Sequence, residues 1–162
     1  MGQELEDVIL EEDTQKNKYL TFMLGKEEYG IGIGYVTEII GIQSITEVPE
    51  LPDYVKGIIN LRGKIIPVID VRLRFAKEAR EYNDRTCTIV IEVKDIIVGL
   101  VVDAMAEVIS IDEENIVPPP QLNSCRQKYI KGVGKAGDNV KLVLDCERFL
   151  SDVEIDSLSN IA

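Results

Sequence analysis

Carboxylates are the most numerous side chains in this sequence that could act chemically. Asp and Glu total 29 against 18 Lys and Arg, and histidine is absent. A glycosidase holds two carboxylates in a cleft, often beside aromatic rings that stack on the sugar. This chain has no Trp, and the missing histidine removes the commonest general base. The sequence therefore does little to support an enzyme that acts through carboxylates.

Three alternating glycines, Gly30, Gly32 and Gly34, suggest at first a phosphate-binding loop. A dinucleotide site needs that loop between a strand and a helix of a βαβ unit, and a P-loop also needs a phosphate lysine. Residues 35–39 provide neither. We therefore expect these glycines to allow close backbone approach or a bulge.

The three cysteines, Cys87, Cys125 and Cys146, are far apart in the chain. A zinc site needs closely spaced cysteines or histidines, and a C-x-x-C pair would be the sign of a redox site. Neither pattern is present. We expect reduced core or surface cysteines, no metal site and no cofactor.

The net charge of −11 limits the partners of the chain. Such a field repels nucleic-acid phosphates and anionic lipid surfaces. The longest apolar run, residues 96–102, is far shorter than the roughly 20 residues of a membrane-spanning helix. The acidic start resembles no secretory signal. These features predict a cytoplasmic protein that binds no nucleic acid and does not insert into the membrane.

Alternating apolar and polar residues predict β-strands through most of the chain. Segments 19–24 and 86–93 alternate and are rich in β-branched residues. Short polar breaks at 25–28 and 94–95 separate them from further apolar runs, so each pair predicts a hairpin.

The two hairpins belong to an internal repeat. An offset of 69 places Leu20 on Ile89 and continues without a gap to residues 48–49 on 117–118. After about six extra residues in the second half, an offset of 75 places 54–58 on 129–133 and 68–71 on 143–146. The sequence therefore indicates a duplicated unit.

Each copy has about five short strands, enough to curl into a small barrel. We expect an all-β protein of two five-stranded SH3-like barrels, at residues 18–85 and 86–151. An acidic flexible tail, 1–17, precedes them, and a tail, 152–162, follows. The sequence also predicts a short C-terminal helix capped by Asp145.

The copies differ at one turn. Residues 60–63 are Asn, Leu, Arg and Gly, whereas residues 135–138 are Lys, Ala, Gly and Asp. Gly63 suits a hairpin position with positive φ, and Arg62 beside it presents a five-donor guanidinium that could clasp a carboxylate. A solvated turn arginine explains the pattern equally well.

Residues 53–72, which include this turn, resemble the signature segment of the CheW family of bacterial chemotaxis coupling proteins. The similarity extends from about Lys18 to Phe149. The resemblance implies a non-catalytic, two-barrel adaptor between chemoreceptors and a kinase. A groove between the barrels would receive the cytoplasmic tip of the receptor, and outer edges would pair with the regulatory domain of the histidine kinase CheA. Other CheW-like domains are further candidate partners within receptor arrays.

The same resemblance implies roles for single residues. Val36, Glu38 and Gly57 match family positions implicated in receptor coupling, Arg62 matches the characteristic arginine, and Gly63 completes its turn. Gly57 could equally be a core-packing glycine. Since Glu38 and Arg62 have opposite charges, we expect them to form an ion pair on the receptor-facing surface.

Two competing functions are compatible with a small β-barrel fold. A regulatory module cut from a kinase would share this fold, but the chain begins with Met1 and contains no kinase ATP-binding sequence. An oligonucleotide-binding barrel would need a basic groove with stacking aromatics, and the chain is acidic with nine aromatic residues.

Overall fold

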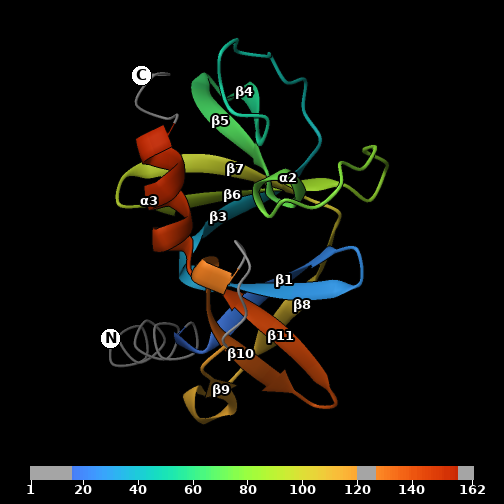
Figure 1. Ribbon diagram of the computed structural model, residues 1–162, viewed down its shortest axis with the longest axis vertical. Coiled ribbons are helices and arrows are strands. Elements are labelled where there is room, and N and C mark those ends of the chain that lie inside the picture. The colour runs from blue at the N-terminus through green and yellow to red at the C-terminus, as the bar shows by residue number, and fades with distance from the viewer. Residues whose placement is uncertain (1–15, 120–126, 157–162) are drawn as a thin grey trace, which may run out of the picture.

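A computed structural model describes residues 16–119 and 127–156 of the chain. The described residues form two sheets, which Figure 1 shows one above the other. The five-stranded sheet contains, in spatial order, β3 (Val36–Gly41), β6 (Cys87–Val93), β7 (Ile96–Val102), β5 (Lys64–Asp70) and β4 (Val55–Leu61). The six-stranded sheet contains β8 (Ala104–Ser110), β1 (Lys18–Leu24), β2 (Glu27–Gly32), β11 (Asn139–Leu144), β10 (Ile130–Ala136) and the two-residue β9 (Ile116–Val117). The expected all-β class is confirmed.

The repeat is visible in the pairing, but the sheets exchange strands. The β1–β2 hairpin belongs to the sheet of β8 to β11, and the β6–β7 hairpin to the sheet of β3 to β5. The two parallel joins are equivalent: Val143 lies opposite Gly30, and Val68 lies opposite Gly99. Each sheet therefore combines strands from both halves of the chain, which differs from the expected barrels at residues 18–85 and 86–151. Alternation reveals that a residue lies in a strand, but not which strand lies beside it.

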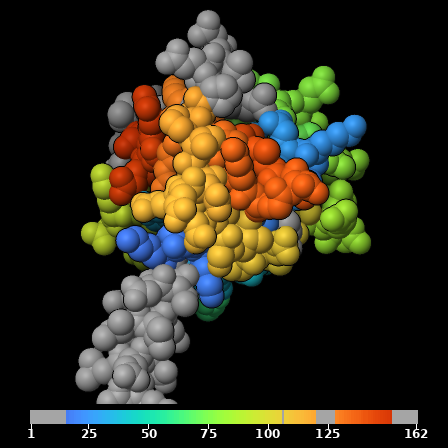
Figure 2. Space-filling view, turned by 90° about the horizontal axis from the view of Figure 1, so that it is seen from below, coloured from blue at the N-terminus to red at the C-terminus, as the bar shows by residue number. Residues whose placement is uncertain are grey.

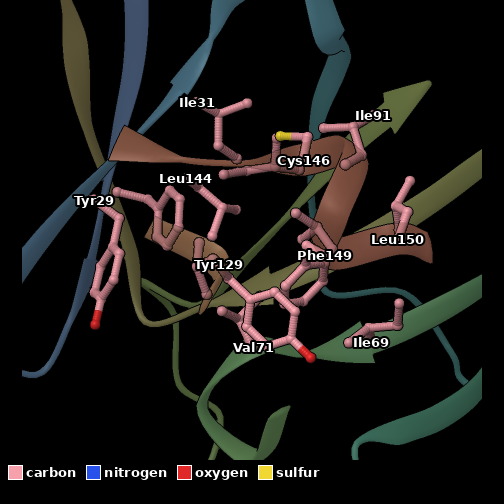
Figure 3. Close-up of a cluster of buried hydrophobic side chains, with 14 of the residues drawn as sticks. Tyr29, Ile31, Ile69, Val71, Ile91, Tyr129, Leu144, Cys146, Phe149 and Leu150 are labelled. Carbon is pink, nitrogen blue, oxygen red and sulfur yellow. The ribbon is translucent and has the colours of Figure 1, made fainter. Parts of the chain in front are cut away.

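One large core fills the space between the sheets and contains buried side chains from both. Five aromatic rings form a chain through it, with neighbouring centroids 5.3 to 6.1 Å apart: Phe22, Tyr29, Phe75, Tyr129 and Phe149. Figure 3 shows Phe149 beside Tyr129, with Leu150 on the same helix. Burial of these rings stabilises the sheets as one unit.

Each sheet also has a smaller cluster of its own. All five strands of the five-stranded sheet contribute to one cluster, which includes Ile59, Ile66, Val68, Val90 and Val101. Ile40 of edge strand β3 packs against it, so the sheet curls around this cluster. Among the described residues, the cluster of the six-stranded sheet is smaller, and its buried members are Tyr19, Ile111 and Val143.

Two short helices follow equivalent strands. α2 (Val71–Arg74) begins after Asp70, whose Oδ1 accepts from the Leu73 N–H at 3.3 Å. α3 (Cys146–Asp156) begins after Asp145, whose Oδ1 accepts from the Arg148 N–H at 3.0 Å. The predicted C-terminal helix and its cap are therefore confirmed. No helix in the described part of the chain is long and apolar enough to span a bilayer.

Candidate interaction site

The turn between β4 and β5 has the geometry that its sequence predicts. Leu61 pairs with Lys64, so Arg62 and Gly63 form a two-residue hairpin loop. Their φ angles are 50° and 86°, and the Gly63 N–H donates to Asn60 Oδ1 at 2.9 Å. Two successive positive φ angles are typical of a type I′ turn, which favours Asn or Gly. The turn therefore holds Arg62 in a conformation that is uncommon for a non-glycine residue.

Arg62 forms the predicted ion pair with Glu38, through its Nη2 and the carboxylate Oε2. Glu38 lies on edge strand β3, whereas Arg62 follows β4, which is the opposite edge of the same sheet. The pair therefore joins the two edges of the curled sheet. Because the Arg62 side chain is largely exposed, the pair contributes about 0.2 to 1 kcal/mol and is weakened by salt.

A hollow of about 330 Å³ opens beside this pair. Its lining combines the charged Glu38 and Arg62 with Ile66 and Val90, two buried members of the smaller core cluster. Thr37, also on the lining, donates its hydroxyl to the Val90 carbonyl at 3.0 Å and ties β3 to β6. The hollow combines an apolar floor with charged donors and acceptors, which suits binding of another protein.

Gly57 has a steric role. Its φ is 146°, and a Cβ at this position would lie 2.1 Å from the Thr46 carbonyl oxygen. Thr46 exchanges two 2.9 Å hydrogen bonds with Ile58, so the chain before β4 lies directly against the strand. Gly57 is buried beneath this bridge. It can therefore affect a partner only through the position of this segment.

Val36 is the first residue of β3 and is half-buried against the large core. A bulge separates it from Glu38 in the pairing with β6. The structure thus brings Glu38, Arg62 and Gly63 together at one end of the five-stranded sheet. Val36 lies on the same strand as Glu38, and Gly57 lies in the interior.

A second hollow, which we call the inter-sheet groove, lies between the edge strands β3 and β8 of the two sheets. It has a volume of about 380 Å³ and is widely open. Ile39 of β3 and Met105 of β8 line it, and they are 40% and 45% exposed. Cys87 of β6 also lines it, together with Ala104 and Met105 of β8, so the two sheets are close here.

The sequence did not single out Ile39 or Met105 as site residues, although the internal repeat contains a signal for Met105. The offset of 69 places Met105 on Val36 and Val108 on Ile39. Val36, for which the family resemblance implies a role in receptor coupling, therefore has its counterpart on β8. Figure 2, seen from below, shows yellow and orange segments of the six-stranded sheet at the surface, including the β10–β11 hairpin (orange).

The titratable groups with shifted pKa values in the described residues hold their protons more tightly than usual. Burial raises the pKa of the Cys146 thiol to about 12, and burial is also the main cause of the raised pKa of Cys87. The pKa of Tyr82 is raised by burial and by the neighbouring Asp70. A nucleophile needs the opposite shift. No group of three or more metal-binding side chains is found in residues 16–119 and 127–156.

Comparison with known proteins covers both sheets. Residues 18–154 match the family described as CheW-like domain. The chain is 38% identical to the chemotaxis protein CheW of Klebsiella aerogenes over 93% of this chain and 91% of that protein. It is 37% identical to CheW of Treponema pallidum over 88% of this chain and 86% of that protein. The crystal structure of the scaffolding protein TtCheW from Thermoanaerobacter tengcongensis has a TM-score of 0.75 and 40% identity, with 80% of this chain and 88% of that chain covered.

Proposed function

Because this chain belongs to the family of CheW-like domains, we propose that it is a non-catalytic adaptor that couples methyl-accepting chemoreceptors to the histidine kinase CheA. The observation that carries the proposal is the inter-sheet groove, with Ile39 and Met105 exposed on two strands that belong to different sheets. Strand β3, which lines one side of the groove, also contains Glu38, and Glu38 pairs with Arg62. In this role the protein works in the cytoplasm, at membrane-anchored receptor arrays.

The inter-sheet groove is the proposed site for the receptor tip. An α-helix is about 10 to 12 Å across with its side chains, and its apolar face commonly docks into an apolar groove of this kind. Ile39 and Met105 would contact that face. Val36, Glu38, Arg62 and Gly63 would shape the β3 side of the surface, and Gly57 would hold the segment before β4.

A different surface is the proposed site for the regulatory domain of the kinase. Ile65 near the start of β5 is 59% exposed, and Val140 near the start of β11 is 55% exposed. They are equivalent residues, related by the offset of 75. Each sheet thus presents an apolar residue beside a hairpin tip, a suitable contact for a domain of the same fold and for other CheW-like domains.

Two matched substitutions test this division. Titration calorimetry would measure binding of the chain to the cognate receptor cytoplasmic fragment and, separately, to the kinase regulatory domain. We expect Ile39→Asp to weaken receptor binding by on the order of tenfold or more and to leave kinase binding intact. Ile65→Asp should do the reverse, so each variant is the control for the other.

Two outcomes would contradict the proposal. If the unsubstituted chain bound neither partner, the coupling role would be wrong. If folded Ile39→Asp protein bound the receptor fragment normally, the groove would not be the receptor site.

A further inference from the structure

The chain passes from the five-stranded to the six-stranded sheet through a single residue, Asp103. β7 ends at Val102 and β8 begins at Ala104. The Asp103 N–H donates to the Met23 carbonyl of β1 at 3.1 Å, which fixes the backbone at the crossing. The direction in which β8 leaves this point determines where Ala104 and Met105 lie, and both residues line the inter-sheet groove.

The Asp103 carboxylate contacts three other segments. Its Oδ2 accepts from the Gly25 N–H at 2.6 Å, in the turn between β1 and β2 of the six-stranded sheet. Its Oδ1 lies 3.5 Å from Nε of Arg72, on the helix that follows β5 of the five-stranded sheet. Arg80, in the connection between α2 and β6, donates to Oδ2 at 3.0 Å. One carboxylate therefore links both sheets and the segment that connects the two halves.

The Asp103 carboxylate itself is largely shielded from water, because its side chain is only 12% exposed, although the Arg80 side chain is 52% exposed. Hydrogen bonds between charged groups are stronger than neutral ones, and screening is weaker at such a site than at the surface. The Arg72 side chain is also largely buried, so it depends on this carboxylate for charge balance. By contrast, the Glu38–Arg62 pair is mostly exposed to solvent.

The other crossing between the sheets lacks such a link. The offset of 69 places Asp103 on Gly34, within the turn η1 (Ile33–Tyr35) that leads from β2 to β3. A Cβ added at Gly34 would have no heavy atom within 4 Å. The duplicated crossings therefore differ: the Asp103 carboxylate contacts three other segments, whereas Gly34 has no side chain and its neighbours Ile33 and Tyr35 make apolar contacts with the large core.

We propose that Asp103 is a positioning residue that sets the angle between the two sheets and thereby the width of the inter-sheet groove. Its effect on binding rests on the proposed function, because the groove is the proposed receptor site. The geometric effect of Asp103 does not depend on that function. Asp103→Asn keeps the size of the side chain and an acceptor for the Gly25 N–H, but it removes the charge that both arginines contact.

The test measures geometry and binding in the full chain. Backbone residual dipolar couplings, fitted separately to the two sheets, report their relative orientation. We expect Asp103→Asn and Arg72→Gln both to change this orientation and to weaken receptor-fragment binding by about fivefold or more. Kinase-domain binding should not change. The matched control is Asp95→Asn, which removes one exposed carboxylate from the β6–β7 turn and should change neither quantity.

An unchanged orientation in both folded variants would overturn the proposal. A changed orientation with normal receptor binding would overturn the link between Asp103 and the groove. If the unsubstituted chain does not bind the receptor fragment, the proposed function fails, while the orientation measurement still supports or overturns the role of Asp103 between the sheets.

Discussion

The two sheets share one pairing pattern, yet equivalent positions in them carry different chemistry. In the five-stranded sheet, Arg62 in the β4–β5 turn pairs with Glu38 and joins the sheet edges. In the six-stranded sheet, the equivalent turn residue is Gly137, which has no side chain to pair with Glu107, the counterpart of Glu38. Both copies keep a two-residue loop with positive φ at its first residue, but only the first copy has a second positive φ, at Gly63, and only that copy has the charged pair.

The interiors of the two sheets also differ, and here the ion pair belongs to the six-stranded sheet. Ile66 and Ile97 pack in the apolar cluster of the five-stranded sheet. Their counterparts in the six-stranded sheet are Lys141 and Glu28, which form an ion pair. The Lys141 side chain is only 6% exposed. One sheet therefore has its ion pair at the surface and an apolar interior, whereas the other has a charged pair at the equivalent interior position.

This difference shows that a shared fold constrains backbone pairing more strongly than it constrains side-chain chemistry. The equivalent parallel joins keep their register because a slip of one residue would reverse every side chain. Single side chains can change without altering the pairing. We therefore expect substitutions at equivalent positions to have unequal effects, and four comparisons test this.

The largest difference is expected between two equivalent glycines. Gly57→Ala should cost about 3 kcal/mol or more of unfolding free energy, because φ is 146° and the added Cβ would clash with a carbonyl oxygen. Gly132→Ala should cost less, about 1 to 2 kcal/mol, because its φ is not positive and its Cβ would lie 2.5 Å from Cγ2 of Ile116 and 3.3 Å from the Val117 carbonyl oxygen, contacts that a small shift of the two-residue strand β9 relieves. Urea unfolding of both variants measures the difference, and equal costs would contradict it.

The buried ion pair should have the next largest effect. Lys141→Ile alone should cost about 2 kcal/mol, because it leaves Glu28 without its partner while Glu28 remains partly hydrated. The double variant Lys141→Ile with Glu28→Ile copies the five-stranded sheet and should be neutral or stabilising by about 1 kcal/mol. Urea unfolding tests both. A double variant as unstable as the single one would show that the apolar pair does not fit this interior.

The surface ion pair should matter more for binding than for stability. Arg62→Glu faces Glu38 with a like charge, so we expect about threefold to tenfold weaker receptor binding and less than about 1 kcal/mol of destabilisation. The charge swap Glu38→Arg with Arg62→Glu should restore binding if the pair acts by shaping the surface. Calorimetry at two salt concentrations measures this. Normal receptor binding and kinase control in Arg62→Glu would exclude a role for the pair.

The smallest effect at neutral pH is expected at Cys146, whose equivalent is the buried Val71. Cys146→Val should change stability by about 0.5 kcal/mol or less near pH 7. Because the thiol pKa rises from 9.0 to about 12 on folding, its contribution is complete below pH 9 and is lost as the pH rises towards 12. As the pH rises from 9 to about 12, Cys146→Val should therefore lose less stability than the parent chain. Urea midpoints at several pH values test this, and parallel curves would contradict it.

The local features of the site were predictable because they depend on neighbouring residues. The positive φ at Gly63 followed from turn chemistry, and the alternating segments became β1 and β6. The offsets of 69 and 75 reappear in the strand pairing. The Glu38–Arg62 pair was predicted from opposite charges together with the family resemblance, and it is present.

The order of residue types was enough to predict the strands, the turns, the duplication and the family. Which strands share a sheet became visible only in the fold, because β-pairing joins backbones far apart in the chain and side-chain alternation does not encode the neighbour. The same limit concealed the contact of Gly57 with Thr46, the Lys141–Glu28 pair and the contacts of Asp103. Each of these depends on segments that meet only after the sheets exchange strands and pack around one core.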